Sequence, residues 1–169
     1  MQRRTLLKLG IGATALLAVA GGGLALLRPG LVNGHLTAGA QSVFRGVGRA
    51  VLDGSLPSDA IERDRALSTH LKRLNDTLAA FPAATQAELS QLLSLLASAA
   101  GRIGLTGLRD DWANASVTDI QSALQGMRAS RLALRQQVYH ALRDLTNAAF
   151  YADPVAWPLM GYPGPRAIV

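Results

Sequence analysis

Apolar residues recur at every third or fourth position through most of the chain between Thr37 and Phe150. This spacing places side chains on one face of an α-helix, whereas a half-buried strand would require alternation of apolar and polar residues. No stretch shows sustained alternation, and β-branched residues are sparse. The sequence therefore predicts an all-α fold, a helical bundle of about four to five helices.

Start and stop signals divide this pattern into helices. The first helix is expected to run from Thr37 to a stop at Asp53-Gly54. Ser58 is expected to cap the second helix, and Pro82 to end it. Each helix carries one apolar stripe, so each should bury one face and leave the other in solvent.

The third helix is predicted to begin at a capping box, in which Thr85 and Glu88 satisfy each other's backbone amides. It is apolar on most of its surface, so we expect it to be the central and most buried element. The glycine-rich stretch 101–107 that follows lacks the context of a phosphate-binding loop. That stretch is interpreted as a linker or a helix cap.

A second capping box, Ser116 to Asp119, starts the last helical pattern, which continues to Phe150 and is kinked or split by Gly126. Four arginines at spacings of three, four and eight residues are expected on one face of it: Arg128, Arg131, Arg135 and Arg143. A solvated helix face is the simpler interpretation. The functional alternative is a basic docking edge for an acidic partner surface.

The chain contains no cysteine, so it cannot ligate an Fe–S cluster, attach a c-type haem or form a disulfide. His35, His70 and His140 are far apart in sequence, and each is expected at the surface or on a helix flank. His140 with Asp144 is the best enzymatic candidate, but the pair lacks a nucleophile. We therefore predict no catalytic residue, no cofactor-binding residue and no metal ligand in this chain.

The N-terminus has the layout of an export signal. Arg3, Arg4 and Lys8 form a basic region ahead of an uncharged apolar stretch, residues 9–27. Paired arginines at this junction resemble the signal of the twin-arginine translocation (Tat) pathway, which a receptor reads. Tat substrates resemble one another in crossing the membrane already folded, usually with a cofactor or partner. The expected location is therefore the periplasm.

The fate of the apolar stretch stays open between two outcomes. Nineteen helical residues span roughly 28 Å, so the segment is long enough to remain as a tether in the inner membrane. Alternatively, cleavage after Ala20, at the small-residue site that Ala18 begins, releases the rest of the chain. Residues 1–30 are assigned to this signal or membrane segment and residues 31–152 to the helical domain.

The charge balance argues against a nucleic-acid partner. The whole chain has 17 Lys and Arg and 11 Asp and Glu, a net charge of +6. Three of these cations, Arg3, Arg4 and Lys8, belong to the signal, which leaves 14 against 11, or +3. A weak and scattered excess of this kind is not the clustered basic surface that nucleic acids require.

The C-terminal residues depart from the helical pattern. Residues 150–166 hold four of the seven prolines and four of the eight aromatic residues. Prolines fix the backbone and remove donors, so residues 153–169 are predicted to form an extended strap. Its large side chains either fold back onto the helices or enter pockets in a partner. The partner-binding candidates are Tyr151, Trp157, Tyr162 and Pro163, with Arg128, Arg131 and Arg135.

Three parts of the chain together resemble a known family: the Tat-type start, the run RAVLDGSLP at 49–57 and the ending FYADPVAWPLMGYPGP at 150–165. The family is the small (gamma, or subunit 3-like) subunit of membrane-bound FAD-dependent dehydrogenases. Its members belong to complexes such as gluconate 2-dehydrogenase and the fructose and glucose dehydrogenases. Only the two ends of the chain carry specific features, because the helical middle is generic.

The resemblance implies a non-catalytic subunit. In such complexes a large flavoprotein of the glucose-methanol-choline type oxidises the substrate, and a multihaem cytochrome c passes the electrons on. FAD and haem would therefore lie in partner subunits, while this chain would carry the Tat signal for the flavoprotein and assist its maturation. The alternative is a membrane-tethered periplasmic helical module that binds a small apolar ligand between its helices.

Overall fold

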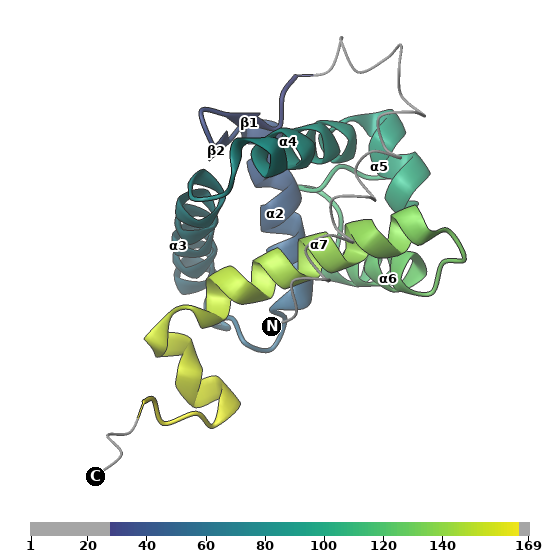
Figure 1. Cartoon of the computed structure of the whole chain (residues 1–169). Helices are drawn as coiled ribbons and strands as arrows, with labels where there is room; N and C mark the ends of the chain where they lie inside the picture. The colour runs from purple at the N-terminus through teal and green to yellow at the C-terminus, as the bar shows by residue number, and fades with distance from the viewer. Residues whose placement is uncertain (1–27, 166–169) are drawn as a thin grey trace.

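The computed structural model describes residues 28–165, in which helices pack around a central helix, α2 (Ala38–Val51) (Figure 1). The other α-helices are α3 (Ala60–Ala79), α4 (Ala83–Ala97), α5 (Ala99–Thr106), α6 (Val117–Arg128) and α7 (Ala133–Tyr151). A two-stranded sheet, β1 (Leu31–Val32) with β2 (His35–Leu36), precedes them, and a 3₁₀ helix, η2 (Pro154–Met160), follows them. The predicted all-α character is confirmed, but the described residues form more helices than expected.

The core lies along α2 rather than along the third helix of the sequence. Val43, Phe44 and Val47 of α2 have no exposed surface, and α3, α4, α6 and α7 all pack against this helix. The prediction that the helix after Pro82 is the most buried was wrong. Its buried residues lie in its second half, at 92–96, because its first turns cover the edge of the bundle.

Two of the three predicted helix caps differ in the structure. The third helix, α4, begins at Ala83, so Thr85 lies inside its first turn and forms no capping box. Asp59 caps α3 in place of Ser58, accepting hydrogen bonds from the backbone amides of the second and third helical residues. The cap at Ser116 is confirmed, because its hydroxyl accepts a hydrogen bond from the Asp119 amide at 3.1 Å.

The glycine-rich stretch is mostly helical. Ser98 accepts a hydrogen bond from the Gly101 amide at 3.1 Å and starts α5, which continues through the glycines to Thr106. Gly107, at φ 79°, ends it in the left-handed conformation that glycine adopts without strain. The linker interpretation was therefore wrong for most of the stretch, and the cap interpretation was right only for its last residue.

A small hairpin, which the sequence analysis did not predict, opens the described chain. Its turn is Asn33-Gly34, with φ 51° and 78°, the backbone conformation that two-residue hairpins favour. Leu31 pairs with Leu36, and both are buried against the helices. The Asn-Gly dipeptide between apolar residues was the available sequence signal for this turn.

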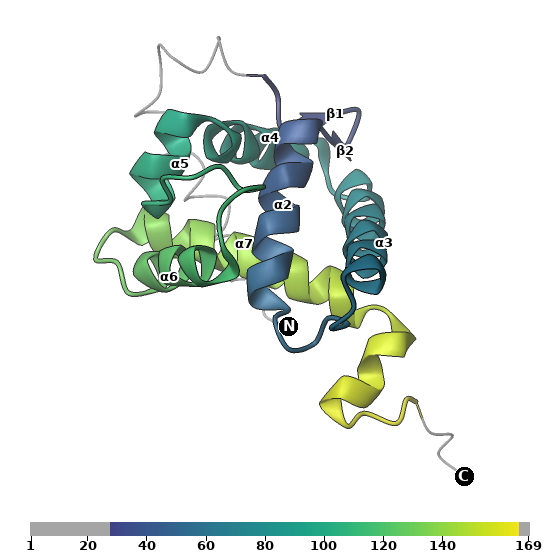
Figure 2. The same cartoon turned by 180° about the vertical axis from the view of Figure 1, so that it is seen from behind.

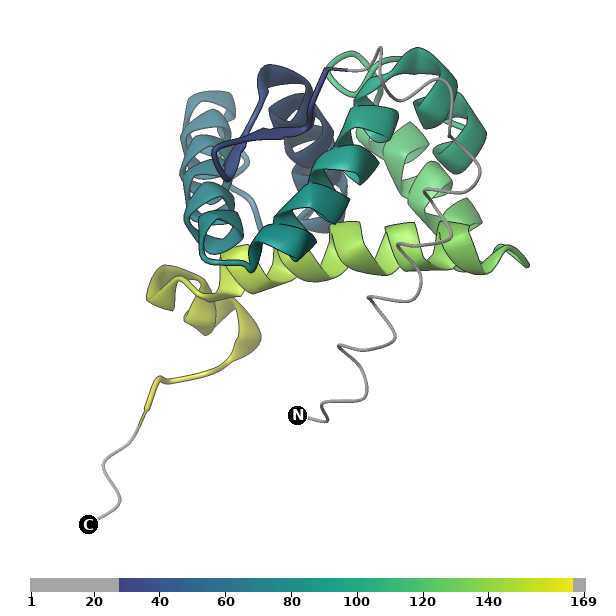
Figure 3. The same ribbon diagram turned by 45° about the horizontal axis from the view of Figure 1, so that its top comes forward.

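The C-terminal segment, defined here as residues 153–165, projects from the end of α7 away from the bundle (Figures 1 and 3). The prediction of an extended strap was wrong over Pro154–Met160, which form η2. Asp153 caps this helix by accepting a hydrogen bond from the Val155 amide at 3.1 Å. Pro154 suits the first helical position, because a residue there has no helical partner for a backbone N–H and proline has none to satisfy. Gly161, at φ 70°, ends the helix.

Candidate functional site

The C-terminal segment is joined to the bundle by an ion pair at its root. Arg73 of α3 donates from Nη2 to Asp153 Oδ2, and the two side chains are 32% and 20% exposed. The same carboxylate caps η2 through its other oxygen. One half-buried aspartate therefore both starts the 3₁₀ helix and holds its first turn against α3.

Trp157 organises the segment from within. Its indole Nε1 donates to the Tyr151 carbonyl oxygen at 3.0 Å, and its ring lies 5.2 Å from the Tyr162 ring, centroid to centroid. Gly164, at φ 92°, closes onto the same indole, because a Cβ added there would lie 3.4 Å from the ring. Trp157 does not belong to the hydrophobic core that the described helices share. Its ring packs within its own segment, while its Nε1 donates to the end of α7, so in part it folds back onto the helices, as one of the two sequence interpretations allowed.

Four large apolar side chains of the segment face solvent. Their exposed fractions are 81% for Val155, 57% for Leu159, 51% for Met160 and 45% for Tyr162. The sequence analysis selected Tyr162 as a partner-binding residue and missed the other three. A strap predicted to be extended did not indicate which of its apolar side chains would be exposed. Pro163, also selected, is exposed, and Tyr151 is half-buried at the end of α7.

The predicted arginine face is not formed as one surface. The chain leaves helical structure between α6 and α7, which separates Arg128 from Arg135 and places Arg131 in the connection. Arg135 is half-buried and donates from Nε to the Leu105 carbonyl oxygen at 2.8 Å, so it ties α7 to α5. Arg128 and Arg131 remain exposed. The sequence analysis placed a kink or split at Gly126, but α6 continues through Gly126 and the break lies after Arg128, at residues 129–132.

The prediction of a position at the surface or on a helix flank was wrong for His70. His70 is fully buried on α3, and neither of its ring nitrogens has a hydrogen-bond partner among the described residues. Its ring contacts Phe150 of α7 edge-on, with centroids 6.4 Å apart. Burial lowers the pKa of His70 to about 4, and the positive charge of Arg73 acts in the same direction. The imidazole is therefore neutral at neutral pH.

The enzymatic candidate gains no supporting contact. His140 and Asp144 are both exposed on α7, and Asp144 accepts a hydrogen bond from Arg143 at 3.3 Å. Within residues 28–165, no group of three or more His, Asp or Glu side chains is arranged to hold a metal ion.

The residues assigned to the signal, Arg3, Arg4, Lys8, Ala18 and Ala20, lie outside the described residues. Of the helices between residues 28 and 165, none combines the length and the apolar character needed to cross a membrane. Comparisons with known protein families, with characterised proteins and with solved structures find no match to this chain.

Proposed function

We propose that this chain is a non-catalytic subunit that binds an FAD-dependent dehydrogenase of the glucose-methanol-choline type, stabilises it and escorts it through the Tat pathway to the periplasm. FAD belongs to that partner in this proposal, and haem to a cytochrome c subunit of the same complex. The observation that carries the proposal is the C-terminal segment, which projects away from the bundle (Figure 2). Four of its large apolar side chains are exposed.

Such side chains are unfavourable in water unless a partner covers them. Large exposed apolar surfaces commonly mark protein–protein contact sites, and a few buried residues carry most of the affinity of an interface. The segment is also ordered in advance, because Asp153 caps its helix and Trp157 packs against Tyr162 and Gly164. Order of this kind lowers the conformational entropy that binding would otherwise cost.

The two ends of the chain have separate tasks in this proposal. The N-terminal arginine pair addresses the complex to the Tat translocon, and the C-terminal segment holds the cargo. The helical bundle between them supplies a folded body that the export pathway accepts. A chain without cofactor ligands of its own has little reason to cross the membrane folded, whereas a chain that carries a flavin-loaded partner does.

The experiment that tests the proposal is co-expression with a flavoprotein dehydrogenase encoded by a neighbouring gene. Val155→Asp combined with Leu159→Asp places two charges in the expected interface without touching the core. Leu132→Asp is the matched control, since Leu132 is 63% exposed at the cap of α7, where aspartate is favourable. We expect the double variant to lose the yellow flavoprotein on affinity purification and the control to retain it.

Deletion of residues 153–169 provides the second arm. We expect the truncated chain to keep its helical circular dichroism and to melt cooperatively at a slightly lower temperature, because the bundle core contains none of the deleted residues but the ion pair of Arg73 with Asp153 is lost. It should nevertheless fail to retain the flavoprotein. Full flavin content and activity of the flavoprotein when this chain is absent altogether would contradict the proposed role in maturation.

A further inference from the structure

A cleft of about 310 Å³ lies between α2, α3 and the loop before α6. Arg45 and Arg49 enter it from α2, one helical turn apart, and Arg63 and Asp64 enter it from α3. Trp112 of the loop contributes to its lining. The sequence analysis did not single out these arginines, because they come from two helices that only the tertiary fold brings together.

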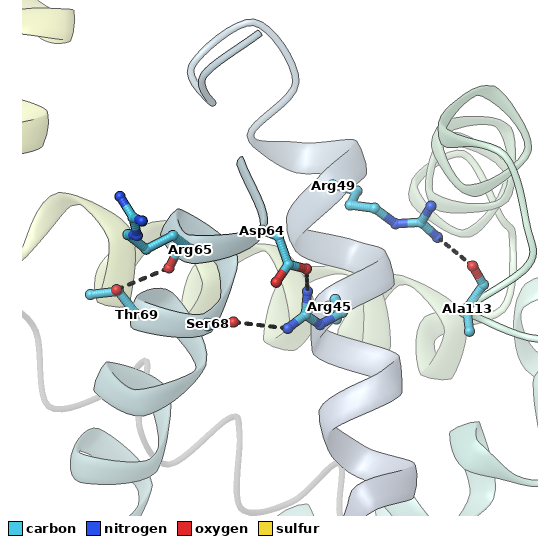
Figure 4. Close-up of polar contacts among 7 residues, drawn as sticks. All are labelled: Arg45, Arg49, Asp64, Arg65, Ser68, Thr69 and Ala113. Carbon is cyan, nitrogen blue, oxygen red and sulfur yellow. Dashed lines mark hydrogen bonds and ion pairs between the residues drawn. The ribbon is translucent and has the colours of Figure 1, made fainter. Parts of the chain in front are cut away.

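The cleft carries more positive than negative charge. Three guanidinium groups against one carboxylate give a formal balance of +2. Arg45 is satisfied within the protein, donating to Asp64 Oδ1 at 2.5 Å and to Ser68 Oγ at 3.0 Å (Figure 4). Its carboxylate partner is itself 68% exposed on the side-chain atoms, so this ion pair lies at the mouth of the cleft.

The other two arginines keep donors for a ligand. Arg49 uses only Nη2, which donates to the carbonyl oxygens of Trp112 at 2.8 Å, Ala115 at 3.0 Å and Ala113 at 3.4 Å; Figure 4 draws the last of these. Among the described residues its Nε and Nη1 donate to no protein acceptor. Arg63 has one long hydrogen bond, at 3.4 Å, to the Ser58 carbonyl oxygen. A guanidinium with free donors forms charge-assisted hydrogen bonds with carboxylates. Arg63 can offer two parallel donors, whereas Arg49, whose Nη2 is already used, can offer only single ones.

We propose that this cleft binds the carboxylates of an acidic segment of a partner protein. Asp64 already pairs with Arg45 at one end of the cleft, so carboxylates of a partner would bind Arg63 and the free donors of Arg49. A free small molecule is less suitable as the ligand, because small-molecule sites enclose most of their ligand whereas the charged groups here reach the solvent. An acidic side chain presented by another polypeptide needs no such enclosure.

The cleft is separate from the C-terminal segment. α2 and the loop before α6 lie in front of α7 in Figure 2, whereas α7 lies in front of α2 in Figure 1. None of the residues that line the cleft belongs to α7 or to the C-terminal segment. The inference rests on the proposed function only for the identity of the partner: the flavoprotein would contact this subunit at the C-terminal segment and again at the cleft.

Binding of a labelled peptide to the full chain tests the inference without the flavoprotein. The probe is Gly-Glu-Ala-Ala-Glu-Gly, and its control replaces both glutamates by glutamine; fluorescence anisotropy is the readout. We expect the acidic peptide to bind, the amide peptide not to bind, and added salt to weaken the complex, because exposed charges are screened. Arg63→Gln should weaken binding about fivefold, the scale of one exposed ion pair.

Two further variants separate a specific cleft from general positive charge. Arg65→Gln makes the same charge change on the same helix, at a side chain 69% exposed that pairs with Glu62, outside the cleft. It should leave peptide affinity unchanged. Asp64→Asn removes the carboxylate that competes for Arg45, so it should increase affinity. Arg63 makes no contact on which the fold depends, so its variant should remain folded.

The inference is overturned if both peptides bind alike, if neither binds, or if Arg63→Gln and Arg65→Gln weaken binding equally. It is also overturned if Arg63→Gln abolishes binding to vesicles of anionic phospholipid while the acidic peptide binds no better than its control. That result would assign the cleft to lipid headgroups. Because the peptide assay contains no flavoprotein, any of these failures would leave the proposed function standing.

Discussion

Arg73 of α3 forms an ion pair with Asp153, eighty residues further along the chain, and Asp153 is also the cap of η2. The pair therefore fixes the place at which the C-terminal segment leaves the bundle. This ion pair is the charged contact between the first turn of η2 and α3.

A double-mutant cycle should measure this connection. Asp153→Asn keeps a side chain that can cap a helix and removes only the charge. Combined with Arg73→Gln, it should give a coupling free energy of about 1 kcal/mol in chemical denaturation, since both side chains are partly exposed. The exposed pair of Arg65 with Glu62 serves as the reference, and its coupling should be smaller. Equal coupling in the two cycles would contradict a special role for Asp153.

The buried His70 should make the stability of this protein fall at acidic pH. Its pKa is lowered from 6.5 to about 4 in the folded state, so between these values the unfolded chain binds more protons than the folded one. Stability is therefore full above about pH 6.5 and decreases as the pH falls towards 4. The loss should approach about 3 kcal/mol, because one pKa unit corresponds to about 1.4 kcal/mol.

His70→Leu should remove most of this pH dependence, because leucine has neither a titrating group nor the two ring nitrogens that lack partners. His140→Gln is the control, since His140 is exposed, and it should leave the pH dependence unchanged. Arg73→Gln should reduce the loss, because the charge of Arg73 helps to lower the pKa of His70. Urea denaturation across this pH range would show the effect. A wild-type protein equally stable at both ends of the range would refute the prediction.

Two glycine-to-alanine substitutions should have opposite effects on stability. A Cβ added to Gly46, on α2, would lie 3.0 Å from the Trp112 carbonyl oxygen and 3.1 Å from its indole ring. Trp112 cannot yield easily, because its Nε1 donates to the Leu96 carbonyl oxygen at 2.7 Å in a buried site. Gly46→Ala should therefore destabilise the protein by about 1–3 kcal/mol.

Gly126, on α6, has no heavy atom near an added Cβ and lies in an exposed part of the helix. Gly126→Ala should stabilise the protein by about 0.5–1 kcal/mol, because alanine loses less backbone entropy on entering a helix. Thermal melting of both variants beside the wild type is the measurement. A stabilising Gly46→Ala would show that the contact between α2 and Trp112 is looser than the structure indicates.

Export should depend on the arginine pair. Replacing Arg3 and Arg4 by lysine keeps the charge of the N-terminus, so a general secretory signal would tolerate the change, whereas a Tat receptor should reject it. Both this chain and its flavoprotein should then remain in the cytoplasm, which fractionation followed by immunoblotting would detect. Unchanged periplasmic amounts of both proteins in the lysine variant would contradict the escort role.

Local sequence signals predicted the helical elements well where the decisive interactions are local. The apolar spacing identified α2 and α3 because it reflects helical geometry, and Ser116 identified the start of α6 because its cap bond closes within three residues. The misplaced start of α4 was also local in origin. Pro82 follows α3 and is itself the N-cap residue of α4, so Thr85 lies inside the first turn of α4 and cannot cap it.

The candidate site depended on contacts between distant residues. Trp157 was identified from composition alone, but its packing against Tyr162 and Gly164 requires η2, whose first turn Asp153 caps. The apolar residues that the segment exposes became distinguishable only once that helix was known. The arginine cleft combines residues of α2 and α3 with a loop near residue 112, and no spacing in the sequence connects them.

The sequence by itself determined that the chain is helical and where α2 and α3 end, because these features follow from interactions among residues a few positions apart. Only the tertiary structure decided that α2 is the centre, that His70 is buried without a hydrogen-bond partner, and that Arg73 holds Asp153. A helix's apolar stripe specifies that it must be covered but not which element covers it. That choice is made by the packing of all the helices together, and it sets the burial and charge environment of each side chain.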